Sequence, residues 1–216
     1  METSPAPVKR CAGLVVLYLC NVNFLAHLYL SGNDDTELLI GNFIADAVTG
    51  PEAKTFPPGV QRGIRLHLSI DHFTDTHPVV EKTKARLRPK FHKYAPVISD
   101  VFYDHFLAAG WKNYSAVSLK NYADHVYNLL AQNENLLPEF TKKMLPHMKR
   151  ENWLLYYATL EGMHGIFLRM SRRTKFESHM EEAAEALKQD YDSYRQEFEL
   201  FFPELQRHCA DFLKTP

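Results

Sequence analysis

Glycine is scarce in this chain, and its scarcity limits the folds and sites that the sequence can form. The 216 residues include only 9 glycines, and none follows Gly165. Glycine-rich loops that bind phosphate and the tight turns of β-rich folds both depend on this residue. The composition therefore favours neither.

Cysteine is also sparse. The three cysteines are Cys11, Cys20 and Cys209, and no pair has the CxxC spacing. Neither a zinc knuckle nor a disulfide framework is supported, and a reducing, cytoplasmic compartment is expected.

The chain lacks an excess of charge and a long apolar run. Its formal net charge is −1, which argues against a generally basic, nucleic-acid-binding protein. The apolar run within residues 9–20 is well short of the roughly 20 residues that a membrane-spanning helix needs, so no membrane association is expected. A signal peptide and a lipoprotein signal are alternative interpretations of this segment, but we favour a native start at position 22. Residues 1–22 are thus expected to be an N-terminal extension, and residues 23–216 a single domain.

Apolar residues recur at helical spacing between strong helix-breaking signals, and no stretch alternates with a period of two. Proline and Ser-Gly or Gly-Pro pairs separate the segments. The sequence predicts helices over residues 24–30, 37–48, 57–74, 78–87, 97–110, 114–131, 138–148, 151–171 and 176–202. The predicted fold is a single-domain, all-α helical bundle.

Histidine, in contrast, is abundant: 11 of the 216 residues, six of them between positions 27 and 105. His67, Asp71 and Asp75 follow one another at intervals of four residues, so at least the first two share one face of a helix. An imidazole and a carboxylate one turn apart can bind the same divalent ion.

Three further predicted helices place a polar side chain among apolar residues. His27 lies in Phe-Leu-Ala-His-Leu, Asp46 in Phe-Ile-Ala-Asp-Ala, and Asp104 in Val-Phe-Tyr-Asp-His-Phe-Leu. Each of these residues has a simpler interpretation when taken alone. His27 could be a core histidine, Asp46 a helix cap, and Asp104 part of an exposed Asp104-His105 pair. Asp100, one turn before Asp104, is expected to be the N-terminal cap or a first-turn acid of its helix. Four helices that each offer such a group are explained most economically by a metal ion in the core of a bundle.

Imidazole and carboxylate ligands without thiolates suit Mn²⁺, Mg²⁺, Fe²⁺ or Zn²⁺. Such an ion polarises a phosphoryl oxygen and activates water near neutral pH. This chemistry favours phosphoester hydrolysis over acyl or hydride transfer.

A series of segments in order along the chain, from about residue 23 to 205, resembles a known family. The segments are residues 23–31, 41–46, 56–58, 63–71, Thr74-Asp75, 104–107 with Trp111, 170–173 and 194–203. They resemble the acyl carrier protein phosphodiesterases, an atypical branch of the HD-domain metal-dependent phosphohydrolases. The resemblance implies an HD-domain-like helical fold and a divalent metal, typically Mn²⁺. It also implies removal of 4′-phosphopantetheine from holo acyl carrier protein to give the apo form.

The resemblance and the spacing together suggest roles for individual residues. We expect the metal site to be formed or supported by His27, Asp46, His67, Asp71 and Asp104. His105 is expected to protonate the departing serine oxygen, with Asp75 orienting a histidine or the water. Arg172 and Arg173 are expected to hold the phosphate, with a solvated helix end as the alternative.

Residues 82–93 carry six basic residues and no acidic one. We expect Lys84, Arg86 and Arg88 to steer an acidic carrier protein, although such a run is often only a solvated face. Two rival functions stay open: hydrolysis of a nucleotide or another small phosphoester, and a non-catalytic helical binding protein. The sequence does not predict the oligomeric state.

Overall fold

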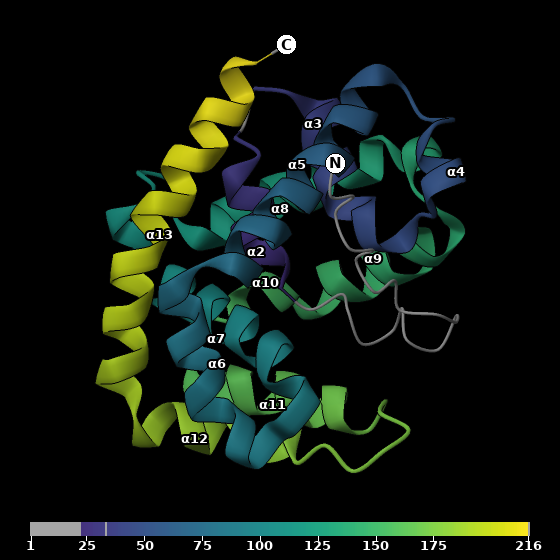
Figure 1. The fold of residues 1–216 in the computed structure, drawn as a ribbon. Coiled ribbons are helices and arrows are strands. Elements are labelled where there is room, and N and C mark those ends of the chain that lie inside the picture. Colours follow the sequence, from purple (N-terminus) through teal and green to yellow (C-terminus); the bar gives the residue numbers. More distant parts are fainter. Residues whose placement is uncertain (1–22, 33, 216) are drawn as a thin grey trace, which may run out of the picture.

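The computed structural model describes residues 23–32 and 34–215, and this part of the chain is helical with no strand (Figure 1). Short 3₁₀ turns, including η1 (Ala45–Ala47), join some of the helices. The α-helices are α2 (Phe24–Leu30), α3 (Thr36–Ile44), α4 (Gly50–Ala53), α5 (Pro58–Thr76), α6 (Pro78–Phe91), α7 (Ala95–Ala109), α8 (Leu119–Gln132), α9 (Glu139–Glu151), α10 (Trp153–Tyr156), α11 (Leu160–Ser171), α12 (Ala183–Gln189) and α13 (Tyr191–Lys214). The prediction of an all-α single-domain bundle is confirmed.

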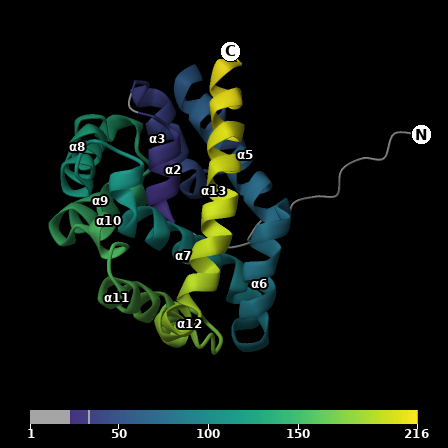
Figure 2. The same ribbon diagram turned by 90° about the vertical axis from the view of Figure 1, so that its left-hand side faces the viewer.

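The short helix α2 lies in the interior of the bundle, where it packs against α3 and α7. Four of its seven residues are buried apolar side chains, and His27 is buried with them. Figure 2 shows α8, α9 and α10 on one side of α2, and α5 and α6 on the other. The long helix α13 runs along the outside and packs against α5, α6 and α7.

Two glycines allow α3 and α5 to cross at very short range. A Cβ atom on Gly41 would lie 2.0 Å from the carbonyl oxygen of Val60, and one on Gly63 would lie 2.0 Å from that of Leu38. Only glycine fits such a contact between two backbones. The crossing brings Asn42, the neighbour of Gly41, next to His67, one turn after Gly63.

Two prolines lie inside helices that the sequence predicted to end before them or at them. α6 continues through Pro89 to Phe91, and α13 continues through Pro203 to Lys214. In both cases the carbonyl that loses its hydrogen bond, of Ala85 or Glu199, belongs to an exposed residue and can bond water instead. Buried apolar residues on both sides of Pro203, such as Phe202 before it and Leu205 after it, hold α13 together.

Other predicted helices are divided or shortened. The predicted helix 151–171 is two helices, because Asn152 adopts a left-handed conformation (φ 53°) and Thr159 caps α11 through the N–H of Gly162. The predicted helix 176–202 divides at Asp190, and α8 begins only after Ser118, which caps it.

The predicted N-terminal extension, residues 1–22, lies outside the described residues. Among the described helices, none combines the length and the apolar character needed to span a bilayer.

Candidate metal centre

Two histidines and an aspartate predicted as metal ligands converge at the crossing of α2, α3 and α5. The Nε2 atoms of His27 and His67 each lie 3.3 Å from a carboxylate oxygen of Asp71. The two imidazole rings stack, with 4.1 Å between their centroids. Both histidines are buried, whereas 43% of the Asp71 side chain is exposed.

Asp46 completes the group from the 3₁₀ turn that follows α3. Its Oδ1 lies 3.3 Å from Nε2 of His67, and 30% of its side chain is exposed. The two imidazoles therefore form the closed side of the cluster, and the two carboxylates form the side that is open to solvent.

Asn42 fixes the orientation of both rings. Its Nδ2 donates to the carbonyl oxygen of His27 (2.9 Å) and to Oγ of Ser31 (2.8 Å), so its Oδ1 must be the acceptor. This Oδ1 lies 2.9 Å from Nδ1 of His27 and 3.1 Å from Nδ1 of His67. Nδ1 of His67 also lies 2.9 Å from the carbonyl oxygen of Asn42. Both Nδ1 atoms must therefore be protonated donors, and in the neutral rings the Nε2 lone pairs point at the carboxylates.

This arrangement requires a positive charge between the rings and the carboxylates. Burial alone would lower the pKa of His67, but the hydrogen bonds and negative charges of Asp46 and Asp71 outweigh it and raise the pKa to about 10. Burial alone would raise the pKa of Asp71, but hydrogen bonds and charges from His27 and His67 lower it well below its usual range.

The donor set fits a divalent metal ion. His27, His67 and Asp71 each offer an atom within 4.8 Å of the others, and Asp46 adds a second carboxylate beside them. Ligand atoms about 2 Å from one ion lie roughly 3 Å from each other, which the 3.3 Å separations approach. Nitrogen and oxygen donors without thiolate suit Mn²⁺, Mg²⁺, Fe²⁺ and Zn²⁺ alike.

Asp104, also predicted as a ligand, lies outside this cluster. Its two carboxylate oxygens accept hydrogen bonds from the backbone N–H groups of Leu25 (3.0 Å) and Ala26 (2.8 Å). It therefore caps the N-terminus of α2 and supports the metal centre only by holding the helix that carries His27. Burial raises the pKa of Asp104 to about 7, against the opposing effect of these hydrogen bonds and one with Tyr157.

His105 does not have the contacts expected of a general acid. Its Nδ1 lies 2.7 Å from the carbonyl oxygen of Tyr157, and its Nε2 lies 2.9 Å from the hydroxyl of Tyr191. The first contact requires an N–H, so Nε2 accepts the Tyr191 proton. Both nitrogens are thus engaged in a buried structural network, and burial lowers the pKa of His105.

Asp75 pairs with a lysine. It contacts neither a histidine nor the cluster, so the orienting role predicted for it has no contact in support. Its Oδ1 lies 2.6 Å from Nζ of Lys84, whose side chain is almost fully buried. Nearby Asp100 is in the second turn of α7 and does not cap it, contrary to prediction. Its Oδ1 is buried without a hydrogen-bond partner, and burial raises its pKa to about 8.

The three α6 residues that were predicted to steer a partner are each neutralised by a neighbouring carboxylate. Lys84 pairs with Asp75, Arg86 with Asp190 and Glu197, and Arg88 with Glu81. These pairs join α6 to α5 and α13 or stay within α6. The expectation that these three residues form a free surface for an acidic partner is therefore not met.

Arg172 and Arg173 lie at the end of α11, where both are exposed and neither contacts the cluster. Their predicted role in holding the phosphate has no contact in support of it.

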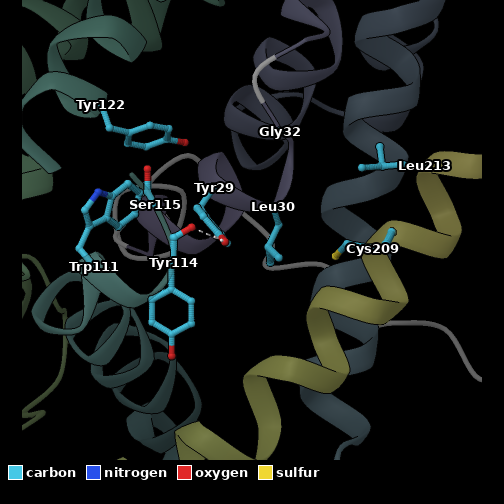
Figure 3. Close-up of a pocket in the computed structure, with 10 residues that line it drawn as sticks. Tyr29, Leu30, Gly32, Trp111, Tyr114, Ser115, Tyr122, Cys209 and Leu213 are labelled. Atoms are coloured by element: carbon cyan, nitrogen blue, oxygen red, sulfur yellow. Dashed lines mark hydrogen bonds between the residues drawn. The ribbon is translucent and has the colours of Figure 1, made fainter. Parts of the chain in front are cut away.

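A cavity of about 350 Å³ lies away from the cluster, between α2, α8 and the end of α13 (Figure 3). Tyr29, Trp111, Tyr114 and Tyr122 form its aromatic walls. Tyr29 follows His27 by two residues, so the two side chains leave α2 on nearly opposite faces. The cavity walls contain none of the proposed ligands.

Asn42 is the main residue of the site that sequence reasoning missed. The sequence could have indicated this residue, because its side-chain amide lies within the apolar run Leu-Leu-Ile-Gly-Asn-Phe-Ile. Asn42 is fully buried, and a buried amide needs several hydrogen-bond partners.

The fold and the cluster together define an all-α protein with a His/Asp centre suited to a divalent metal ion. The family model described as "Acyl carrier protein phosphodiesterase" matches residues 22–205. The chain therefore belongs to this family.

Curated relatives agree with this assignment. The acyl carrier protein phosphodiesterase of Photorhabdus laumondii subsp. laumondii is 32% identical over 198 residues, which cover 90% of this chain and 100% of the relative. Those of Pectobacterium atrosepticum (30% over 196 residues) and Yersinia enterocolitica (29% over 191 residues) cover 90% and 88% of this chain, and 98% of each relative. No solved structure matches significantly.

Proposed function

We propose that this protein is a metal-dependent phosphodiesterase that hydrolyses 4′-phosphopantetheine from holo acyl carrier protein. The observation that carries the proposal is the convergence of His27, His67, Asp46 and Asp71 within a chain of the acyl carrier protein phosphodiesterase family. The products are apo carrier protein and free 4′-phosphopantetheine. The cytoplasm, which the scarcity of cysteine predicts, is the proposed site of action.

The chain's own residues prepare the site before substrate arrives. Asn42 holds both imidazoles with Nε2 facing the carboxylates, and Asp71 contacts both rings. His27, His67, Asp71 and Asp46 would hold the ion, for which Mn²⁺ is the proposed identity. A bound divalent ion supplies polarisation of the phosphoryl oxygen and activation of water.

The open side of the cluster determines how the substrate approaches. Asp46 and Asp71 are its partly exposed members, so the phosphodiester and the attacking water reach the cluster from their side. Attack of water at phosphorus forms a new P–O bond and breaks the bond to the serine oxygen of the carrier protein. That oxygen takes up one proton, which balances the proton that the attacking water gives up. His105 does not carry this proton in the proposal, because both of its nitrogens are engaged.

The test is incubation of the protein with holo acyl carrier protein and Mn²⁺, followed by intact-mass measurement of the carrier protein. We expect loss of the mass of the prosthetic group. The rate for Asp71→Asn is expected to be lower by about 100-fold or more, because this carboxylate contacts both imidazoles.

Asp124→Asn is a matched control, because Asp124 is a half-exposed aspartate on α8 whose ion pair is with Lys120 on the same helix. It should retain the wild-type rate. Absence of any mass loss with Mn²⁺, Mg²⁺, Fe²⁺ and Zn²⁺ would refute the assignment. Turnover of a small phosphodiester alone would then favour the rival substrate class.

A further inference from the structure

The loop after α11 carries exposed cations that, unlike Lys84, Arg86 and Arg88 on α6, have no carboxylate partner in the described part of the chain. Arg172, Arg173 and Lys175 are all exposed, and none forms an ion pair with another described residue. Residues 162–176 contain no acidic side chain. No ion pair among the described residues neutralises these three charges, and the next carboxylate in the sequence, on Glu177, is exposed and lies 3.8 Å from His179.

An exposed aromatic ring lies among these cations. The side chain of Phe176 is 67% exposed, and Nζ of Lys93 lies 4.3 Å from its ring centroid. Oγ1 of Thr174 lies 2.8 Å from the carbonyl oxygens of both Ser171 and Phe176, which fixes the shape of the loop. We call Lys93, Arg172, Arg173, Lys175 and Phe176 the α11 patch.

The α11 patch adjoins the end of α2 that leads to the candidate metal centre. Arg173 lines a small cavity of about 20 Å³ together with Phe24 and Tyr157. Phe24 precedes His27 by three residues, so both lie on the same side of α2, one turn apart. In Figure 1 the loop after α11 projects from the lower right of the molecule, where a partner can reach it.

We propose that the α11 patch is the surface on which the acidic carrier protein docks, an inference that rests on the proposed function. Unpaired arginine and lysine side chains attract a surface rich in carboxylates and accelerate its association. An exposed aromatic side chain surrounded by polar groups is the usual form of an apolar anchor in such interfaces. A carrier protein seated here would lie beside the N-terminal end of α2, about one helical turn from His27, and its modified serine would enter the cluster from the side of Asp46 and Asp71.

The test compares two triple charge reversals. The patch variant is Arg172→Glu/Arg173→Glu/Lys175→Glu, and the matched control is Lys112→Glu/Lys143→Glu/Lys188→Glu, which reverses three exposed lysines elsewhere that also lack ion pairs. The measured quantity is the Kd of apo carrier protein, which cannot be turned over, at low and at physiological salt. Circular dichroism and Tm show whether each variant is folded.

We expect the patch variant to raise Kd at low salt by on the order of tenfold or more, and the control by less than about twofold. Phe176→Ser should weaken binding at both salt concentrations, because it removes an apolar contact. KM for holo carrier protein should follow Kd, with kcat little changed. If the triple variant fails to fold, Lys175→Glu and Phe176→Ser provide the same comparison.

Three results would overturn the inference: wild-type Kd in the patch variant, equal weakening in both triple variants, or no binding of apo carrier protein to the wild type at low salt. Patch-dependent binding without hydrolysis would instead refute the proposed function and leave the surface standing.

Discussion

Asn42 connects the two imidazoles of the candidate metal centre to the surrounding helices. Asn42→Leu keeps the number and branching of the side-chain heavy atoms but removes the acceptor for both Nδ1–H groups. The affinity for Mn²⁺ is expected to fall by about 10- to 100-fold, because outer partners of this kind fix the ligand tautomer. Isothermal titration of chelator-treated protein with Mn²⁺ measures the change.

Two further variants control for structural damage at this position. Asn42→Asp keeps the acceptor oxygen for both Nδ1–H groups but loses the donor to the His27 carbonyl oxygen, so it should retain more affinity than Asn42→Leu and less than the wild type. Asn121→Leu replaces an exposed asparagine on α8 and should have no effect. Wild-type affinity in Asn42→Leu would contradict the role assigned to the amide.

The raised pKa of His67 makes the stability of the metal-free protein dependent on pH. The folded-state pKa of about 10 exceeds the ordinary value of 6.5. The contribution of protonated His67 to the free energy of unfolding is therefore complete below pH 6.5 and is lost as the pH rises through 10. Asp104 and Asp100 titrate at or below about 8. Asp100 and the buried Cys209 thiol, whose pKa is raised to about 12, also contribute between pH 8 and 9. The part due to His67 is expected to approach about 1.4 kcal/mol per pH unit there, and comparison with a variant that lacks His67 separates it from the others.

Thermal unfolding in the presence of a chelator checks this expectation. Tm should fall between pH 8 and 9 in the wild type, and the fall should be much smaller in His67→Asn. Saturating Mn²⁺ should likewise reduce the fall. A Tm independent of pH in the chelated wild type would show that no proton is held between the rings and the carboxylates.

The sequence could predict that His27, His67, Asp46 and Asp71 lie close together, because helical spacing and an apolar frame identify polar groups that face a core. The same frame surrounds Asp104 and His105, and it cannot distinguish a ligand from a cap or a buried hydrogen bond. Their partners, the N-terminus of α2 and the residues Tyr157 and Tyr191, lie 52 or more residues away in the chain. Only the tertiary structure reveals such partners.

At the level of helices, the glycine crossing of α3 and α5 determines where Asn42 meets His67. A methyl group in Gly63→Ala would lie 2.0 Å from the carbonyl oxygen of Leu38, so the two helices must separate. We expect a loss of about 3 kcal/mol or more in the free energy of unfolding, together with weaker Mn²⁺ binding. Chemical denaturation and metal titration measure the two effects.

Gly165→Ala is the matched control, because the nearest atom to its Cβ is the end of the flexible Arg169 side chain at 3.5 Å. This helix-interior substitution should stabilise the protein by about 0.5–1 kcal/mol. Equal behaviour of the two variants would show that the close crossing does not constrain the site.

Helix type was predictable from periodicity, whereas several helix ends were not. Pro89 and Pro203 act as breakers in local sequence, yet buried Phe91 and Leu205 beyond them keep each helix continuous. Conversely, Asn152 ends α9 within a segment whose apolar spacing continues. The predicted likeness to HD-domain proteins stays a prediction, because no solved structure matches this fold significantly.

At the scale of the whole molecule, charges that are distant in sequence neutralise one another. The basic strip on α6 and the acidic residues of α13 look like two independent surfaces in the sequence. The structure joins them, because Arg86 lies 2.5 Å from Asp190 and 2.7 Å from Glu197. Oε2 of Glu197 also accepts a hydrogen bond from Thr83 on α6 (2.7 Å).

Arg86→Leu tests whether this network holds α13 in place. Glu197 is only 8% exposed, so loss of Arg86 leaves a nearly buried carboxylate without its cation. The half-exposed position of Arg86 moderates the cost, which we expect to be about 2 kcal/mol, or a fall in Tm of roughly 5 °C. Arg88→Leu, whose partner Glu81 is half-exposed, should leave Tm nearly unchanged, because exposed ion pairs contribute little to stability.

The same variants separate a structural role for α6 from a docking role. If the strip serves to anchor α13, KM for holo carrier protein is unchanged in both Arg86→Leu and Arg88→Leu, even where Tm falls. A rise in KM for Arg88→Leu without a change in Tm would indicate that the carrier protein docks on α6 after all. The cations of the α11 patch form no ion pair with another described residue. The Arg172→Glu/Arg173→Glu/Lys175→Glu variant is therefore expected to show the opposite behaviour: KM for holo carrier protein rises while Tm stays constant.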